Sequence, residues 1–173
     1  MEPKMAGRVA GKKAHPSRDD SQQRDHSPFQ MSASGLLAGT DVLTLDGALA
    51  VEHICVGDRV VTRDTGMAKV TAVEALSVTT EAIWIAAGSL GHTRPDQDIT
   101  LPAAQAVFLR DWRAQALYGQ AQASVRAERL VDGEFIKSLG RQKMKLYRLI
   151  FETPHILYAG GLELVSHAKV FSR

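Results

Sequence analysis

The sequence predicts an all-β domain, because three turn signals separate short apolar runs between residues 35 and 64. These signals are Asp46-Gly47, Val56-Gly57-Asp58 and Asp64-Thr65-Gly66. Asp-Gly suits a type I′ hairpin, since both central residues of that turn need positive φ, which Asp tolerates and Gly adopts freely. Turns that recur about every 8–12 residues are typical of compact all-β domains and not of alternating βαβ units. We therefore expect a body built from hairpins.

Beyond this first stretch, the apolar runs predict further strands in chain order. A half-exposed strand with a bulge is expected over residues 67–76, and another over residues 82–86, with Trp84 as a core anchor. Residues 92–98 form a polar loop in this interpretation, and the apolar residues between 99 and 109 form the next strands.

The second half of the chain predicts one short helical turn and a closing hairpin. Residues 111–123 have a helical composition that Gly119 interrupts, and the short helical turn is expected over residues 125–131. Residues 140–145 are interpreted as a basic, solvated turn. A closing hairpin is expected from a strand over residues 146–151 that pairs with residues 155–162.

Size and composition indicate one ordinary globular domain with polar ends. The chain has 173 residues, of which 45% are hydrophobic and 23% charged, so it can bury a core without metal or disulfide staples. Residues 1–33 hold six Lys or Arg against four acids, which accounts for the net charge of +2. We interpret residues 1–33 as a disordered, polar and basic tail, residues 34–165 as the folded domain and residues 166–173 as a C-terminal tail.

The sequence shows neither a signal peptide nor a membrane-spanning segment, so it does not fix the cellular location. Residues 1–30 lack the apolar segment of a signal peptide, and no run of 18 apolar residues exists. A cytoplasmic location is the default expectation, and export without a cleaved signal is the alternative.

A series of short blocks follows in a fixed order: Gly39-Thr40, Asp46-Gly47, Val51-Glu52-His53-Ile54, Gly57-Asp58-Arg59-Val60 and Thr62-Arg63-Asp64. In order and spacing these blocks resemble the opening of a Hint domain, the self-processing module shared by inteins and the autoprocessing part of hedgehog proteins, and in particular that of bacterial Hint domains. Two later blocks, over residues 127–133 and 156–162, extend the resemblance to about residues 35–162. The resemblance implies an elongated, horseshoe-like fold.

The resemblance also implies a reaction for which this chain lacks the reacting groups. In the family, a Cys or Ser at position one attacks the preceding carbonyl, and a histidine protonates the departing amide nitrogen. Here the nucleophile position is Gly35, and the two histidine positions are Gln105 and Pro154. No asparagine exists in the chain for the cyclisation that completes splicing. The sequence thus predicts a degenerate Hint domain with no family catalytic residue in place, and its status as an enzyme stays open.

Three alternatives accompany this interpretation. Residual autocleavage would need Ser34 to attack the Ala33 carbonyl, with His155 as a replacement base. A non-catalytic interaction module would bind a peptide at an exposed strand edge. A nucleic-acid binder would use the basic tail and residues 137–145, but those residues lack interleaved aromatics.

The expected partner is the chain's own polypeptide or another protein segment, and not nucleic acid or a membrane. No cofactor or metal is expected, because the remaining histidines are scattered in sequence. The single cysteine, Cys55, is expected to be a packed or half-buried side chain.

Overall fold

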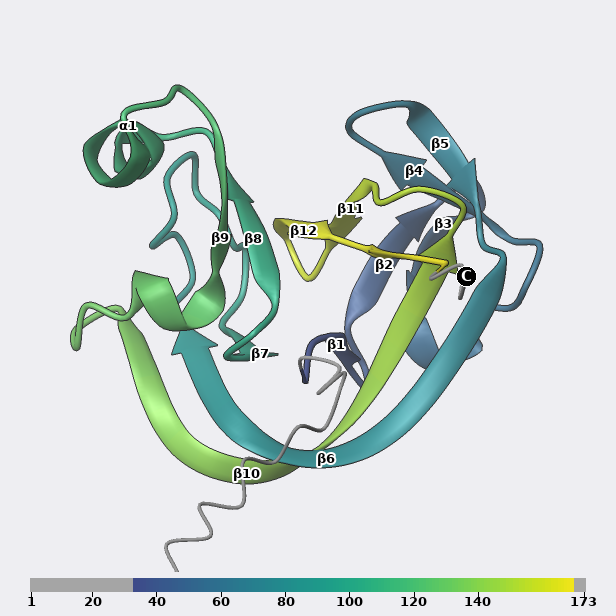
Figure 1. The fold of residues 1–173 in the computed structure, drawn as a ribbon, viewed down its shortest axis with the longest axis horizontal. Coiled ribbons are helices and arrows are strands. Elements are labelled where there is room, and N and C mark those ends of the chain that lie inside the picture. The colour runs from purple at the N-terminus through teal and green to yellow at the C-terminus, as the bar shows by residue number, and fades with distance from the viewer. Residues whose placement is uncertain (1–32, 170–173) are drawn as a thin grey trace, which may run out of the picture.

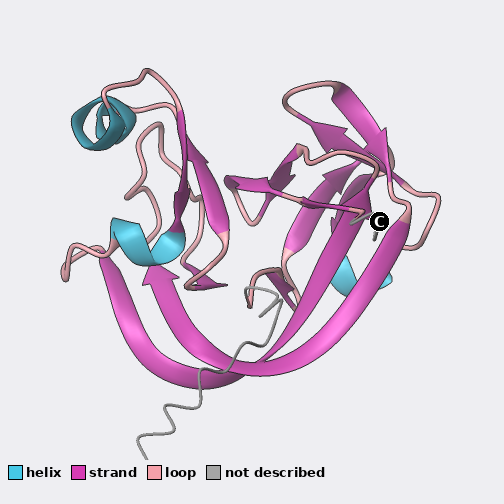
Figure 2. Cartoon of the chain, in the orientation of Figure 1, coloured by secondary structure: helices cyan, strands magenta, loops and turns pink. Residues whose placement is uncertain are grey.

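The computed structural model describes residues 33–169 and confirms a body made almost entirely of strands (Figures 1 and 2). The expected N-terminal tail lies outside the described residues except for Ala33, and so do residues 170–173. The elements, in chain order, are β1 (Leu36–Leu37), β2 (Asp41–Thr44), β3 (Gly47–Ala50), the 3-10 helix η1 (Val51–His53), β4 (Arg59–Thr62), β5 (Gly66–Lys69), β6 (Ala72–Ile85), β7 (Ile99–Pro102), β8 (Ala106–Leu109), α1 (Trp112–Tyr118), β9 (Ala123–Arg126), the 3-10 helix η2 (Ala127–Leu130), β10 (Ile136–Phe151), β11 (Ile156–Ala159), β12 (Leu162–Val165) and β13 (His167–Ala168).

Two long strands, β6 and β10, form an antiparallel ribbon that organises the molecule. They pair from Ala72 opposite Ile150 to Ile85 opposite Ile136, with one register shift between Ser138 and Arg141. In Figure 1 the ribbon curves like a horseshoe beneath the other strands, which confirms the elongated, horseshoe-like shape expected for the fold.

The strands divide into two sheets, and both strands of the ribbon belong to the first. One sheet has the order β1-β10-β6-β7, with β13 beside β10, and the other has the order β3-β2-β4-β11-β12-β8-β9, with β5 beside β4. The hairpin β2–β3 and the hairpin β4–β5 lie over one arm of the horseshoe, while β8, β9 and α1 lie over the other arm (Figure 1).

The main core contains side chains from both sheets. Val42, Leu101, Phe151 and Leu164 are each at most 1% exposed. Alternation along β6 buries Ile83 and Ile85 and turns Trp84 toward the opposite face, because side chains of a strand alternate between its two faces.

Trp84 is therefore only half-buried, with the ammonium of Lys137 at 5.9 Å from its ring centroid. The expectation that Trp84 anchors the core is wrong, and its two isoleucine neighbours fill that role.

The Asp46-Gly47 hairpin is present, but its turn is not of type I′. Thr44 pairs with Gly47, which leaves Leu45 and Asp46 as the loop. Gly47 has a φ of +105°, whereas Asp46 is not among the residues with positive φ. The turn therefore uses the conformational freedom of glycine after the loop and not within it.

The closing hairpin differs from the prediction in its partner strand. β11 pairs with β12 along its whole length, whereas β10 pairs with β6, β1 and β13. The apolar residues at the end of β10 are buried by this central position in their sheet, with Leu149 and Phe151 at most 2% exposed.

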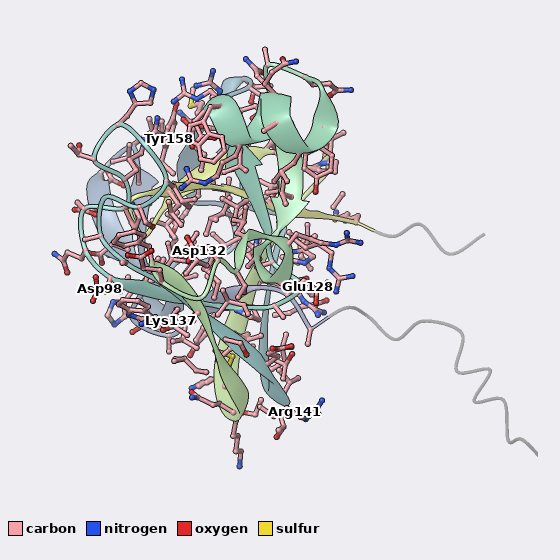
Figure 3. All side chains as sticks on the ribbon, turned by 90° about the vertical axis from the view of Figure 1, so that its left-hand side faces the viewer. Asp98, Glu128, Asp132, Lys137, Arg141 and Tyr158 are labelled. Atoms are coloured by element: carbon pink, nitrogen blue, oxygen red, sulfur yellow. The ribbon has the colours of Figure 1, made fainter. Side chains whose placement is uncertain are left out.

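Residues 140–145, expected to be a basic turn, lie within β10 on the exposed part of the ribbon. Figure 3 shows Lys137 and Arg141 there, with Arg141 extending away from the body. The cations stay solvated, as expected, but on a strand.

The helical content also differs from the prediction. The helical turn expected over residues 125–131 is confined to η2, because Ala123–Arg126 pairs with β8 as β9. Residues 112–118 form α1, which Asp111 caps at its start and Gly119 ends with a φ of +66°. Within residues 33–169, no helix is long and apolar enough to cross a membrane.

The core assignment can be tested with two leucine substitutions. Leu101 is 0% exposed and Leu45 is 53% exposed. We expect Leu101→Ala to lower the free energy of unfolding by about 2–5 kcal/mol, because it removes buried methyl groups and leaves a cavity. Leu45→Ala should change it by less than about 0.5 kcal/mol. Urea unfolding monitored by circular dichroism measures both, and equal losses would contradict the assignment.

Candidate functional site

The peptide bond between Ser34 and Gly35 is buried and bound on both of its polar atoms. Arg148 donates from Nε to the Ser34 carbonyl oxygen at 2.9 Å. On the other side, the Gly35 N–H donates to Oε1 of Gln105 at 3.0 Å. Ser34 and Gly35 are both buried. The structure therefore brings two positions singled out from sequence, Gly35 and Gln105, into direct contact.

Four separate segments build this arrangement. The peptide bond precedes β1, which pairs with β10 through Leu36 opposite Tyr147, so the next residue of β10, Arg148, lies within reach of Ser34. Gln105 lies in the tight turn between β7 and β8, where its N–H donates to the Pro102 carbonyl at 2.9 Å. β13 supplies the fourth segment.

Gln105 is 1% exposed, and hydrogen bonds fix the orientation of its amide. Nε2 donates to the carbonyl oxygens of Ala106 and Val165, each at 3.0 Å, while Oε1 faces the Gly35 N–H. A flipped amide would place two donors together on one side and leave two acceptors without a donor on the other. The network therefore leaves only a carbonyl-type oxygen facing the Gly35 nitrogen, and that oxygen carries no proton to give.

A side chain at Gly35 would be strained and tightly packed. Its φ is +145°, in the region that favours glycine. A Cβ added there would lie 3.0 Å from the backbone oxygen of Tyr147, 3.3 Å from Cβ of Leu146 and 3.4 Å from Cγ of Arg148. A cysteine in this backbone would require β10 or the segment before β1 to shift.

Ser34 contacts a histidine, but not the one considered from sequence. Its hydroxyl lies 2.7 Å from Nε2 of His167 on β13. Burial lowers the pKa of His167 below its usual 6.5, and the Arg148 guanidinium lowers it further, while Glu74 acts in the opposite direction. A neutral imidazole at neutral pH has one ring nitrogen free to accept a proton.

His155 lies elsewhere and has different partners. Its Nδ1 is 2.8 Å from Oδ2 of Asp64, and its ring meets Phe151 edge-on at 5.4 Å between centroids. Asp64 also accepts the Ile156 N–H at 3.0 Å, so the carboxylate and the imidazole tie the β4–β5 turn to β11. The structure does not bring His155 to Ser34, and Pro154 is exposed in the loop before it.

Two residues of the site were missed in the sequence. His167 was assigned to a tail, but β13 pairs in parallel with β10 and places it beside Ser34. Arg148 was counted as part of an apolar strand, although a lone cation in such a run indicates a buried role. It is 4% exposed, and its Nη1 lies 3.8 Å from a carboxylate oxygen of Glu74.

A small cavity of about 10 Å³ adjoins the site and is lined in part by Gly35, Gln105 and His167. It is large enough for about one water molecule.

Cys55 lies elsewhere in the molecule and is exposed, contrary to expectation, because it precedes the turn before β4. Within residues 33–169, no group of three or more His, Cys, Asp or Glu is arranged to hold a metal ion.

The role of Gln105 can be tested by truncation. Gln105→Ala would leave the buried Gly35 N–H and two carbonyl groups without their partner. We expect it to lower the free energy of unfolding by about 1–3 kcal/mol. The matched control is Gln142→Ala on the exposed part of the ribbon, which should cost less than about 0.5 kcal/mol. Chemical denaturation measures both, and a cost for Gln105→Ala no greater than the control would contradict this role.

The lowered pKa of His167 predicts a pH dependence of stability. As pH falls below 6.5, the unfolded chain binds a proton at this histidine before the folded chain does. Its contribution is therefore complete above 6.5 and is lost as pH falls toward the lower pKa of the folded state. We expect His167→Gln to flatten the fall in unfolding free energy between about pH 7 and pH 5. His53→Gln, at an exposed position, is the control, and an unchanged profile in His167→Gln would contradict the prediction.

A family model described as "Hint domain" matches residues 34–169. No curated protein matches the chain. An intein-like bacterial domain from Clostridium thermocellum is similar in structure, with 18% sequence identity and a TM-score of 0.51, covering 79% of this chain and 99% of that chain. The gp41-1 intein is also similar, with 16% identity and a TM-score of 0.50 over the same shares of the two chains. At these identities the two structures support the fold alone.

Proposed function

Because the chain belongs to the Hint domain family, we propose that it is a degenerate member of the protein self-processing class, which binds the Ser34–Gly35 peptide but does not cleave it. One contact carries this proposal. The nitrogen at the position of the family's leaving group is the Gly35 nitrogen, and it faces Oε1 of Gln105 at 3.0 Å. Cleavage requires a proton to be delivered to that nitrogen, and an amide oxygen has none to give near neutral pH.

The attacking group is missing at the same position. Gly35 has no side chain, and a Cβ there would make tight contacts of 3.0–3.4 Å with atoms of β10. The chain therefore has, at the nucleophile position, a glycine against which β10 packs closely. This packing favours a settled loss of the family reaction and argues against a shift in register.

The Ser34 carbonyl nevertheless has a positively charged donor on its oxygen. A guanidinium on the carbonyl oxygen would stabilise negative charge that develops there during attack. Without a nucleophile and a proton donor, the same contacts only hold the peptide. In this proposal the module's partner is its own polypeptide, retained as an uncut chain.

A second candidate is residual cleavage one residue earlier, and the contact between Ser34 and His167 favours it. The Ser34 oxygen would attack the Ala33 carbonyl carbon, with neutral His167, at 2.7 Å, accepting the hydroxyl proton. The bond from that carbon to the Ser34 nitrogen would break as the proton returned to the nitrogen, leaving an ester. Water or hydroxylamine would then release the segment that ends at Ala33.

Intact-mass measurement distinguishes the two candidates. We expect the purified full chain to keep its mass during prolonged incubation at neutral pH, with or without a thiol or hydroxylamine. A fragment that begins at Ser34, absent in both Ser34→Ala and His167→Gln, would replace the main proposal with the second candidate. A fragment that begins at Gly35 would contradict both, because nothing in either scheme breaks that bond.

A further inference from the structure

The buried carboxylate of Glu163, far in sequence from the Ser34–Gly35 peptide, contacts three arginine guanidinium groups. Glu163 on β12 is 2% exposed. Arg110 binds it through two hydrogen bonds, at 2.7 Å and 3.0 Å. Arg94 lies 3.0 Å and Arg63 3.4 Å from the same carboxylate oxygen, Oε1. Three cations therefore share one anion.

One arginine would be enough to neutralise this glutamate. The paired bonds from Arg110 occupy both carboxylate oxygens of Glu163 in the fork geometry that arginine favours. Arg94 and Arg63 bring two further positive charges to the same carboxylate, and the like charges of the three guanidinium groups repel one another. The nearby Asp111 does not compensate, since Arg113 binds its carboxylate at 2.6 Å. The cluster thus carries an excess of positive charge.

The additional arginines also keep unused hydrogen-bond donors. A guanidinium has five N–H donors. Among the described residues 33–169, Glu163 is the only hydrogen-bond or ion-pair partner of the Arg94 guanidinium, whose side chain is 31% exposed. The Arg63 guanidinium likewise pairs only with Glu163 in that part of the chain, and it stacks at 5.5 Å from the Phe108 ring centroid. These donors face partly open solvent.

The backbone loop that positions Arg94 contains strained residues. The two residues before it, His92 and Thr93, have φ values of +50° and +58°, which is unfavourable for non-glycine residues and most of all for a β-branched one. Arg94 itself is fixed at both backbone groups, with its N–H on Gly91 at 3.0 Å and its carbonyl accepting from Leu90 at 2.9 Å. Strain of this kind is typical of ligand clamps.

We propose that Arg94, Arg110 and Arg63 form a binding site for a small oxyanion, a phosphate or a carboxylate, at the mouth of the hollow above Glu163. The hollow holds about 20 Å³, and its lining includes Arg94, Arg110, and the carboxylates of Glu163 and Asp111, which are paired with arginines. Arg63 does not line the hollow itself but contacts two lining residues, Glu163 and Phe108. That space fits one oxygen atom of a ligand, with the remaining atoms at the surface. The ligand supplies the negative charge that the cluster lacks. This site is independent of cleavage at Ser34.

The test compares thermal unfolding of the full chain in sodium phosphate, sodium acetate and sodium chloride at equal ionic strength and pH. We expect about 50 mM phosphate or acetate to raise the unfolding midpoint by about 2–4 °C over chloride, since a ligand that binds only the folded state stabilises it. Arg94→Gln should abolish this rise. Arg141→Gln, on the exposed ribbon, should retain it.

The outcomes separate the two ligand sources and a purely structural cluster. A rise with phosphate alone assigns a phosphate site, and a rise with acetate alone assigns a carboxylate site. No rise over chloride overturns the proposal, and so does an equal rise in wild type and Arg94→Gln. If Arg94→Gln does not fold, Arg63→Gln takes its place, and a rise that persists in that variant overturns the proposal.

Discussion

The buried peptide bond between Ser34 and Gly35 is held by hydrogen bonds from two segments that are distant in sequence. Its oxygen is bound by a guanidinium from β10 and its nitrogen by the Gln105 amide, so neither polar group is left unpaired away from water. Both contacts depend on the ribbon of β6 and β10, because β10 pairs with β1 and β6 pairs with β7, next to the turn that holds Gln105. The long ribbon therefore serves as the frame that presents one peptide bond to groups distant in sequence.

Two residues of the site, Gln105 and Gly35, lack the reacting groups that the family resemblance implies at their positions. A glutamine makes the contact that would orient a departing nitrogen, and its other hydrogen bonds leave it no alternative orientation. A glycine with a φ of +145° lies where the nucleophile is expected, and β10 packs against it. In the proposed function, the contacts that hold the intact peptide also leave it without a nucleophile and a proton donor.

Turn chemistry and block spacing were enough to predict the fold class, because they depend on local sequence patterns. The same blocks marked Gly35 and Gln105 as family positions, but the contact between them joins residues distant in sequence and was not predicted. Pairing between distant strands could not be predicted in this way. β10 was assigned to a hairpin with β11, although its long pairing with β6 depends on how the whole sheet closes. His167 was missed for the same reason, since a two-residue strand gains its position only from β10.

Hydrogen exchange at the Gly35 amide, followed by NMR on the full chain, measures whether this peptide is buried and held by Gln105. We expect one amide signal for Gly35, protected to the level of the slowest core amides, because its N–H is buried and bound by Gln105. An amide that exchanges as fast as those of exposed loops would contradict the account. So would the absence of the amide signal because Gly35 has become a free amino terminus.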